Sequence, residues 1–282
     1  MPIADVRGTS INYEVLGNHG PWVALSPGGR RALDSVTPLA LHMAAAGYRV
    51  LVHDRRNCGM SDIVIGGDQS EYEMWADDLH ELLSQMEALP AVVGGGSSGC
   101  RLSVLFALKY PDAARALLLW RVTGGAFAAQ RLTENYYDKY IRAAREGGMA
   151  AVCALDHFNE RIEVRPSNRQ VLMAMAARQF IAAMERWRDQ FRKGAELPII
   201  GASERDLNSI RVPACIIPGN DKTHSHATAE AAHRMIPGSE LHDLFPGDLD
   251  VDLVPPEDWA HKEAEMATVF DSFLRRAQAK AA

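Results

Sequence analysis

The sequence predicts an α/β protein with a mostly parallel central sheet flanked by helices. In residues 1–123, short apolar runs typical of strands alternate with amphipathic stretches typical of helices. The same alternation resumes after residue 210, while the residues between show mostly helical patterns. Because parallel strands need crossover connections, this alternation favours helices packed on the faces of one sheet.

The first part of the chain supplies most of the expected strands. They are predicted over 10–15, 22–25, 48–53, 91–93 and 114–122, each an apolar or β-branched run. Residues 71–89 carry apolar side chains at helical spacing, and residues 101–110 form an apolar helix that Pro111 ends.

The middle of the chain is predicted to be an insertion of helices. Its clearest stripe has helical spacing over nearly 20 residues and consists of Met173, Ala176, Phe180, Met184, Trp187 and Phe191. We expect residues 124–210 to form a helical cap, or lid, over the functional edge of the sheet. Residues 1–123 and 211–282 would then form the core, with strands near 212–217 and 240–245, a helix near 227–235 and a final helix ending near Arg276.

The composition excludes several classes of protein. The 282 residues include 30 Lys and Arg against 36 Asp and Glu, a net charge of −6, and 47% of them are hydrophobic. These are the proportions of a globular protein with a full core. No basic stripe indicates nucleic acid, and no apolar run is long enough for a membrane span. Four scattered cysteines and an unremarkable N-terminus favour a cytoplasmic location, and a homodimer is left open.

The most informative motif is the glycine-rich turn over 94–100, between an expected strand and an expected helix. Gly95-x-Ser97-x-Gly99 fits the G-x-S-x-G nucleophile elbow, in which a sharp strand-to-helix turn exposes a serine. The same residues fit a dinucleotide fingerprint, Gly94-x-Gly96-x-x-Gly99, and Arg121 at the end of the next strand would suit a 2′-phosphate. A plain structural turn is the third interpretation. The nucleotide interpretation is the weaker one because several strands precede the motif.

Neighbouring segments resemble the α/β-hydrolase superfamily over nearly the whole chain. Residues 53–62, HDRRNCGMSD, are similar to its D-x-R-G-x-G-x-S-D segment, with Asn57 in place of the first glycine. Residues 26–29, SPGG, follow the expected third strand, where the family usually has His-Gly. Residues 217–224, IPGNDKTH, resemble its acid loop. The resemblance implies the α/β-hydrolase fold, a helical cap, no cofactor and serine-nucleophile hydrolysis of the esterase or lactonase type.

The resemblance also implies a set of catalytic roles. Ser97 would be the nucleophile and Asp221 the acid. We take His261, the only histidine after the last expected strand, as the base, although it lies close to the start of a helix; His224 is the alternative base. The oxyanion hole would use the backbone N–H groups of Ser98 and of Gly28 or Gly29.

Substrate-binding residues are expected near the same edge and in the cap. Arg121 is a candidate partner of a substrate carboxylate, and surface solvation is the simpler interpretation of Arg30 and Arg31. The remaining candidates are apolar or aromatic: Trp120, Tyr136, Tyr137, Tyr140, Phe158, Met184 and Trp187. No metal site is expected, because the acidic run 248–252 lacks the residues of a calcium loop.

The expected function is hydrolysis of a carboxylic ester or lactone of a small molecule through an acyl-enzyme. Hydrolysis of a C–C bond uses the same three residues and is the nearest alternative. A catalytically weak ligand-binding protein on this fold is a second alternative, suggested by the unusual position of His261. An NADP-linked reductase, suggested by the glycine pattern and Arg121, is a third.

Overall fold

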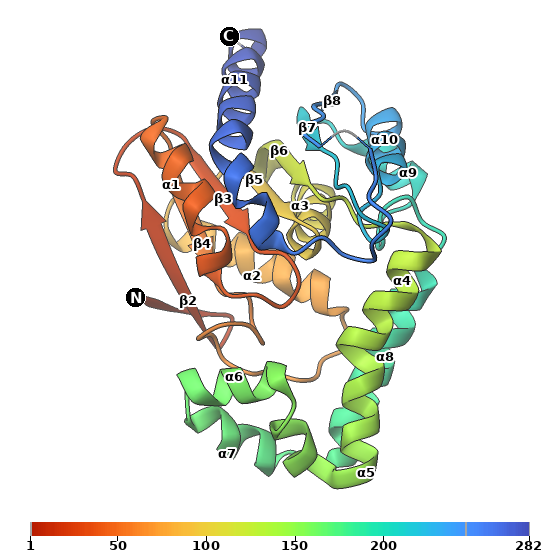
Figure 1. Ribbon diagram of the computed structural model, residues 1–282. Helices are drawn as coiled ribbons and strands as arrows, with labels where there is room; N and C mark the ends of the chain where they lie inside the picture. The colour runs from red at the N-terminus through yellow and green to blue at the C-terminus, as the bar shows by residue number, and fades with distance from the viewer. Residues whose placement is uncertain (1, 246, 282) are drawn as a thin grey trace.

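The computed structural model describes residues 2–245 and 247–281, and its centre is a mostly parallel sheet (Figure 1). The strand order within the described residues is β1-β2-β4-β3-β5-β6-β7-β8. Only the pairs β1–β2 and β2–β4 are antiparallel. The strands are β1 (Ile3–Val6), β2 (Thr9–Leu16), β3 (Trp22–Ser26), β4 (Arg49–His53), β5 (Ala91–Gly96), β6 (Ala114–Trp120), β7 (Ala214–Ile217) and β8 (Glu240–Leu241).

The side chains of the central strands alternate between two hydrophobic cores, one on each face of the sheet. In β6, Leu117 and Leu119 join the core formed with α2 (Glu71–Gln85), α3 (Ser98–Lys109) and α10 (His226–Met235). Ala116 and Leu118 join the core formed with α1 (Thr37–Ala45) and α11 (Glu263–Ala281). Strands buried on both faces read as continuous apolar runs, which is why they stand out in the sequence.

Helices follow one another between β6 and β7, over residues 125–209. They are α4 (Gly125–Thr133), a π-helical turn (Glu134–Asp138), α5 (Lys139–Cys153), α6 (Asp156–Val164), α7 (Ser167–Ala174), α8 (Ala177–Lys193) and α9 (Glu204–Ser209). In Figure 1, α4 and α5 follow one another along one line with α8 beside them, and α6 and α7 lie at the end of the molecule farthest from the C-terminus of α11. Helices are thus present over the expected range, and the role of this helical segment as a cap stays a prediction.

The structure differs from the expected elements at several places, and the strand expected near 240–245 is only Glu240–Leu241. The long stripe beginning at Met173 is two helices, because Met175 and Ala176 have extended backbone, and Met173 is exposed. The strand expected over 114–122 ends at Trp120, since Arg121 adopts a φ of 51°. The start of the final helix is a 3₁₀ segment, Pro256–Lys262. The sequence interpretation also missed β1 and α1.

The carboxyl ends of the central parallel strands meet at one edge of the sheet. Ser26 pairs with Gly95, Gly96 with Trp120, and Trp120 with Ile217. The loops that follow β3, β5, β6 and β7 therefore converge, as expected for a ligand-binding edge of an open α/β sheet. Among the helices of the described residues, none is both long and apolar enough to span a bilayer.

Candidate active site

Ser97 occupies a strained turn between β5 and α3. Its backbone has φ 53° and ψ −109°, a left-handed conformation that is rare for a residue with a side chain. The flanking glycines leave space for this turn. A methyl group on Gly95 would lie 2.4 Å from the carbonyl carbon of Gly99, and one on Gly99 would lie 2.2 Å from the carbonyl oxygen of Ser26. The G-x-S-x-G pattern is thus required by close backbone packing.

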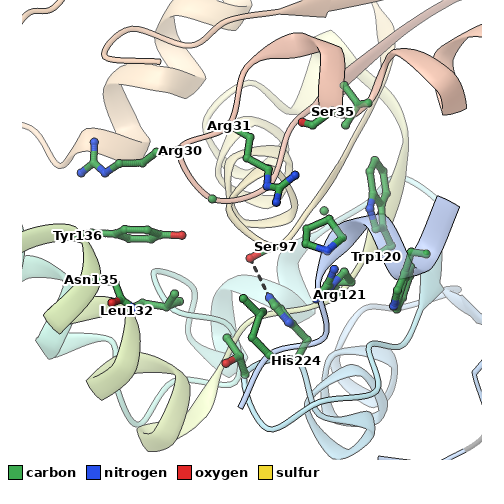
Figure 2. Close-up of a pocket in the computed structure, with 18 of the residues that line it drawn as sticks. Arg30, Arg31, Ser35, Ser97, Trp120, Arg121, Leu132, Asn135, Tyr136 and His224 are labelled. Carbon is green, nitrogen blue, oxygen red and sulfur yellow. Dashed lines mark hydrogen bonds between the residues drawn. The ribbon is translucent and has the colours of Figure 1, made fainter. Parts of the chain in front are cut away.

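The imidazole of His224 contacts Ser97 directly (Figure 2). The Nε2 atom of His224 lies 2.9 Å from Oγ of Ser97, and Nδ1 lies 2.9 Å from Oδ1 of Asp221. Because a carboxylate only accepts hydrogen bonds, Nδ1 carries the proton and Nε2 accepts from the serine hydroxyl. The hydroxyl of Thr123 lies 3.4 Å from the same Oγ.

Asp221 is completely buried and held by several donors. Its Oδ1 accepts the backbone N–H groups of Thr223 and His224, and its Oδ2 accepts the backbone N–H of Val254 at 3.0 Å. The guanidinium of Arg121 donates to Oδ2 at 3.0 Å. Burial alone would raise the pKa of Asp221, but the hydrogen bond to His224 and the neighbouring charges lower it below its ordinary value. The carboxylate therefore stays ionised.

Burial has the opposite effect on His224. Its pKa is lowered from 6.5 to about 4, because desolvation and the charge of Arg121 together outweigh the opposing hydrogen bond to Asp221. At neutral pH the imidazole is uncharged and ready to accept a proton, as a general base must be.

The structure does not bring His261 to the nucleophile. His261 lies in the 3₁₀ segment Pro256–Lys262, is exposed, and has its ring beside that of Phe245. The sequence interpretation gave His261 priority because it follows the last strand, as the family's histidine does. In this chain the alternative base, His224, lies beside Ser97 instead, and it belongs to a turn only three residues after Asp221. The expected contact between His261 and Ser97 is therefore corrected.

The loop after β3 lies against Ser97 and is oriented by a buried arginine. A methyl group on Gly28 would be 3.4 Å from Cβ of Ser97. Nη2 of Arg55 donates to the carbonyl of Gly29 at 2.8 Å and to that of Gly28 at 3.4 Å. Because C=O and N–H point in opposite directions across a trans peptide, the N–H of Gly29 faces away from Arg55. On the other side of Ser97, Ser98 begins α3, where N–H groups lack partners within the helix.

A cavity of about 340 Å³ opens above Ser97. Gly28, Gly29, Trp120, Arg121 and His224 all line it, in agreement with their expected location. Tyr136 points its hydroxyl toward the cavity from the helical segment, while Trp120 lies on the other side of Ser97 (Figure 2). Arg121 reaches the cavity wall, and its Nη2 donates to Asp221 and to the carbonyl of Val254.

Four of the expected substrate-binding residues do not line this cavity. Tyr137, Phe158, Met184 and Trp187 are at most 1% exposed and pack in the core of the helical segment. Tyr137 and Trp187 border a smaller cavity instead. Helical spacing identified these side chains as buried, but it could not indicate which of them face the nucleophile.

The cavity wall includes four residues that the sequence interpretation passed over, Arg131, Leu132, Asn135 and Lys139, beside Tyr136 and Tyr140, which it named. They lie in two parallel rows with a spacing of four residues along α4, the π-helical turn and α5. One row is polar and the other apolar or aromatic: Arg131, Asn135 and Lys139, and Leu132, Tyr136 and Tyr140. Residues four apart share a helix face, so this pattern was available in the sequence. Single-turn π segments often occur at functional sites.

The other sequence signals have structural explanations here. A methyl group on Gly96 would lie 2.3 Å from Nε1 of Trp120, so that glycine is needed for strand packing. In the described part of the chain, no group of three His, Cys, Asp or Glu side chains is arranged to hold a metal ion. All four cysteines are buried as free thiols.

Comparisons with known proteins agree with the architecture. Residues 21–120 match the family model of the alpha/beta hydrolase fold. A Bacillus subtilis protein named "Uncharacterized hydrolase YraK" is 31% identical over 113 residues, 40% of this chain and 41% of the relative. A mouse protein, "sn-1-specific diacylglycerol lipase ABHD11", is 31% identical over 119 residues, 41% of this chain and 38% of the relative. The chain thus matches less than half the length of both.

The likeness to solved structures extends over nearly the full chain. The enol-lactonase from Burkholderia xenovorans LB400 superposes with a TM-score of 0.65 at 21% identity, covering 97% of this chain and 100% of that one. The strand order, the turn at Ser97 and the family match all indicate the same fold. The chain has the α/β-hydrolase fold.

Proposed function

We infer that this protein is a serine hydrolase that cleaves a carboxylic ester or lactone of a small molecule through an acyl-enzyme. The observation that carries the proposal is the continuous hydrogen-bonded chain Ser97–His224–Asp221, with both imidazole contacts at 2.9 Å. A serine hydroxyl is a weak nucleophile until an aligned neutral imidazole takes its proton.

In the proposed reaction, Oγ of Ser97 attacks the substrate carbonyl while its proton moves to Nε2 of His224. The imidazolium then protonates the leaving alcohol oxygen, which departs from the tetrahedral intermediate and leaves an acyl-serine. A water molecule gives a proton to the neutral imidazole and attacks the acyl carbon. Return of that proton to Oγ releases the carboxylic acid and restores Ser97.

The negative charge of the tetrahedral oxygen needs donors near Ser97. We assign this role to the N–H of Ser98, at the N-terminus of α3, and to the N–H of Gly29. The contact from Arg55 to the Gly28 carbonyl supports the second choice, because that carbonyl and the Gly29 N–H belong to one peptide group and point in opposite directions. Loss of one such donor typically costs about 10²- to 10³-fold in kcat.

The helical segment is proposed to act as a cap, since α4 and α5 supply one wall of the cavity above Ser97. The relatives include a protein named as a lipase and a structure named as an enol-lactonase, which supports ester-type chemistry. Hydrolysis of a C–C bond remains the alternative, because it requires the same triad. The ligand-binding alternative loses its motivation, since it depended on the position of His261.

The test combines active-site labelling with matched histidine variants. The protein is incubated with a fluorophosphonate, and mass spectrometry should find the label on Ser97 and none in Ser97→Ala. Steady-state hydrolysis of 4-nitrophenyl butyrate should fall by about 10³-fold or more in His224→Ala. His261→Ala is the matched control and should keep the full rate. A folded wild-type protein that takes no label, or a His224→Ala variant with unchanged turnover, would refute the proposal.

A further inference from the structure

The cavity above Ser97 has a strongly unequal charge distribution. Five cationic side chains line it, against the single carboxylate of Glu263. Two of the cations are neutralised inside the protein: Arg30 makes a buried bidentate ion pair with Glu71, and Arg121 pairs with Asp221. Arg31 pairs with Glu257 at an exposed position, where such a pair contributes little.

The remaining two cations, Arg131 and Lys139, have no carboxylate partner among residues 2–245 and 247–281. Both are partly buried, and they stand at the two ends of the polar row of the helical segment, with Asn135 between them. The ammonium group of Lys139 lies 5.3 Å from the ring centre of Tyr140. Their position on one helix face directs two unpaired positive charges to the same wall of the cavity.

A buried neighbour experiences this positive potential. His157 also lines the cavity, and its Nε2 atom has no hydrogen-bond partner in the described part of the chain. Burial lowers its pKa well below 6.5, and the charges of Arg30, Arg161 and Lys139 lower it further. The uncharged His157 imidazole can form a hydrogen bond in the cavity without adding a charge to it.

The cavity wall opposite the helical segment, formed by α1, the 3₁₀ segment and α11, is mainly apolar. Leu39, Trp259 and Met266 line the cavity from α1, the 3₁₀ segment and α11. Ser97 and His224 lie between Trp120, on that side, and the residues Leu132, Asn135 and Tyr136 of the helical segment (Figure 2). The reacting carbonyl would thus sit between an apolar wall and a cationic wall.

We propose that the substrate is an anionic ester or lactone whose free carboxylate binds between Arg131 and Lys139 while its reacting carbonyl lies at Ser97. The proposal rests on the function inferred above and specifies its substrate class. Two unpaired cations favour an anionic ligand over a neutral one of the same shape, and they also raise the rate of encounter at low salt.

The experiment compares isosteric substrates that differ only in the terminal group of the acyl chain. Mono-4-nitrophenyl esters of glutarate and adipate are paired with 4-nitrophenyl pentanoate and hexanoate. After subtraction of the uncatalysed rate, kcat/KM of the wild type should favour the anionic esters by about tenfold or more at low salt. The preference should shrink as salt is raised, because screening weakens the attraction.

Charge-removing variants test the two residues. Arg131→Gln and Lys139→Gln should each lower the preference by about threefold, and the double variant should remove it, with a much smaller loss on the neutral esters than on the anionic ones. Lys193→Gln, at an exposed end of α8 outside the cavity, is the matched control for a change in net charge. A wild-type preference near one, or an equal loss on neutral and anionic esters, would overturn the proposal.

A binding measurement separates this inference from the proposed function. In calorimetry, Ser97→Ala should bind monomethyl adipate more tightly than dimethyl adipate. The difference in affinity should vanish when Arg131→Gln and Lys139→Gln are added to that variant. Equal binding of the two esters would refute the carboxylate site. Failure of fluorophosphonate to label Ser97 would instead refute the proposed chemistry, whatever the result of the binding comparison.

Discussion

Hydrolysis by this protein should persist at acidic pH, because His224 is held neutral far below the pKa of an ordinary histidine. Activity requires the neutral imidazole, so the rate is lost as the pH falls through the pKa of His224. Burial places that pKa at about 4, with the charge of Arg121 acting in the same direction and Asp221 opposing both.

The size of the effect follows from the two pKa values. With a pKa of about 4, roughly 90% of the imidazole is neutral at pH 5; with 6.5, only about 3% would be. The rate at pH 5, relative to the plateau, should thus be about 30-fold higher than that of an ordinary histidine base. Lowering the pKa from 6.5 to about 4 corresponds to about 3 kcal/mol in favour of the neutral form.

The assay is kcat/KM for 4-nitrophenyl butyrate between pH 4.5 and 8, with folding followed by circular dichroism at each pH. The wild type should show no acid decline above pH 5. In Arg121→Gln, removal of the neighbouring cation should raise the pKa of His224 and move the acid limb to higher pH. A wild-type limb centred between pH 6 and 7, or no movement in Arg121→Gln, would contradict the electrostatic reasoning.

Three further outcomes are expected. Arg55→Met should lower kcat on neutral esters by about 10- to 100-fold with little change in KM, since the Gly29 peptide loses its orientation, and Arg55→Lys should recover part of it. His53→Leu should resist acid unfolding. Burial and Arg55 lower the pKa of His53 to about 3, so the wild type loses stability as His53 of the unfolded chain becomes protonated below pH 6.5. Between pH 7.5 and 4.5, urea unfolding should show the variant gaining about 3 kcal/mol relative to the wild type, and parallel pH dependences would refute this. Gly96→Ala should lower the melting temperature by several degrees, since its methyl group would overlap Trp120, and an unchanged melting curve would contradict that packing.

The strained turn at Ser97, the proposed nucleophile, was predictable from the sequence because its requirements are local. The glycines around Ser97 are needed for one strand-to-helix turn, so three small residues at fixed spacing make the turn recognisable in the sequence. The base was less predictable. His224 reaches Ser97 because the turn after β7 folds back on itself through an isolated bridge between Asp221 and His224, a geometry that residue types alone do not specify.

The substrate-binding wall shows a second limit of the sequence. Periodicity correctly marks Phe180, Met184 and Trp187 as one buried face of α8, but burial against other helices and exposure to a cavity give the same pattern. The break at Met175 and Ala176 carries no glycine or proline, so tertiary packing decides it. The two rows of residues on α4 and α5 have a regular spacing in the sequence, but only the cavity shows that this helix face lines the site.

The short span between Asp221 and His224 has a consequence for how the site can change. Acid and base belong to one turn, so their mutual geometry is set by a few consecutive peptide bonds and moves as a unit. In the described residues between β8 and the 3₁₀ segment, Val254 supports this turn through its backbone: its N–H donates to Asp221 and its carbonyl accepts from Arg121. Changes in that stretch can therefore leave the contact between Asp221 and His224 intact, provided that the backbone at Val251, Asp252 and Val254 keeps its place against the turn.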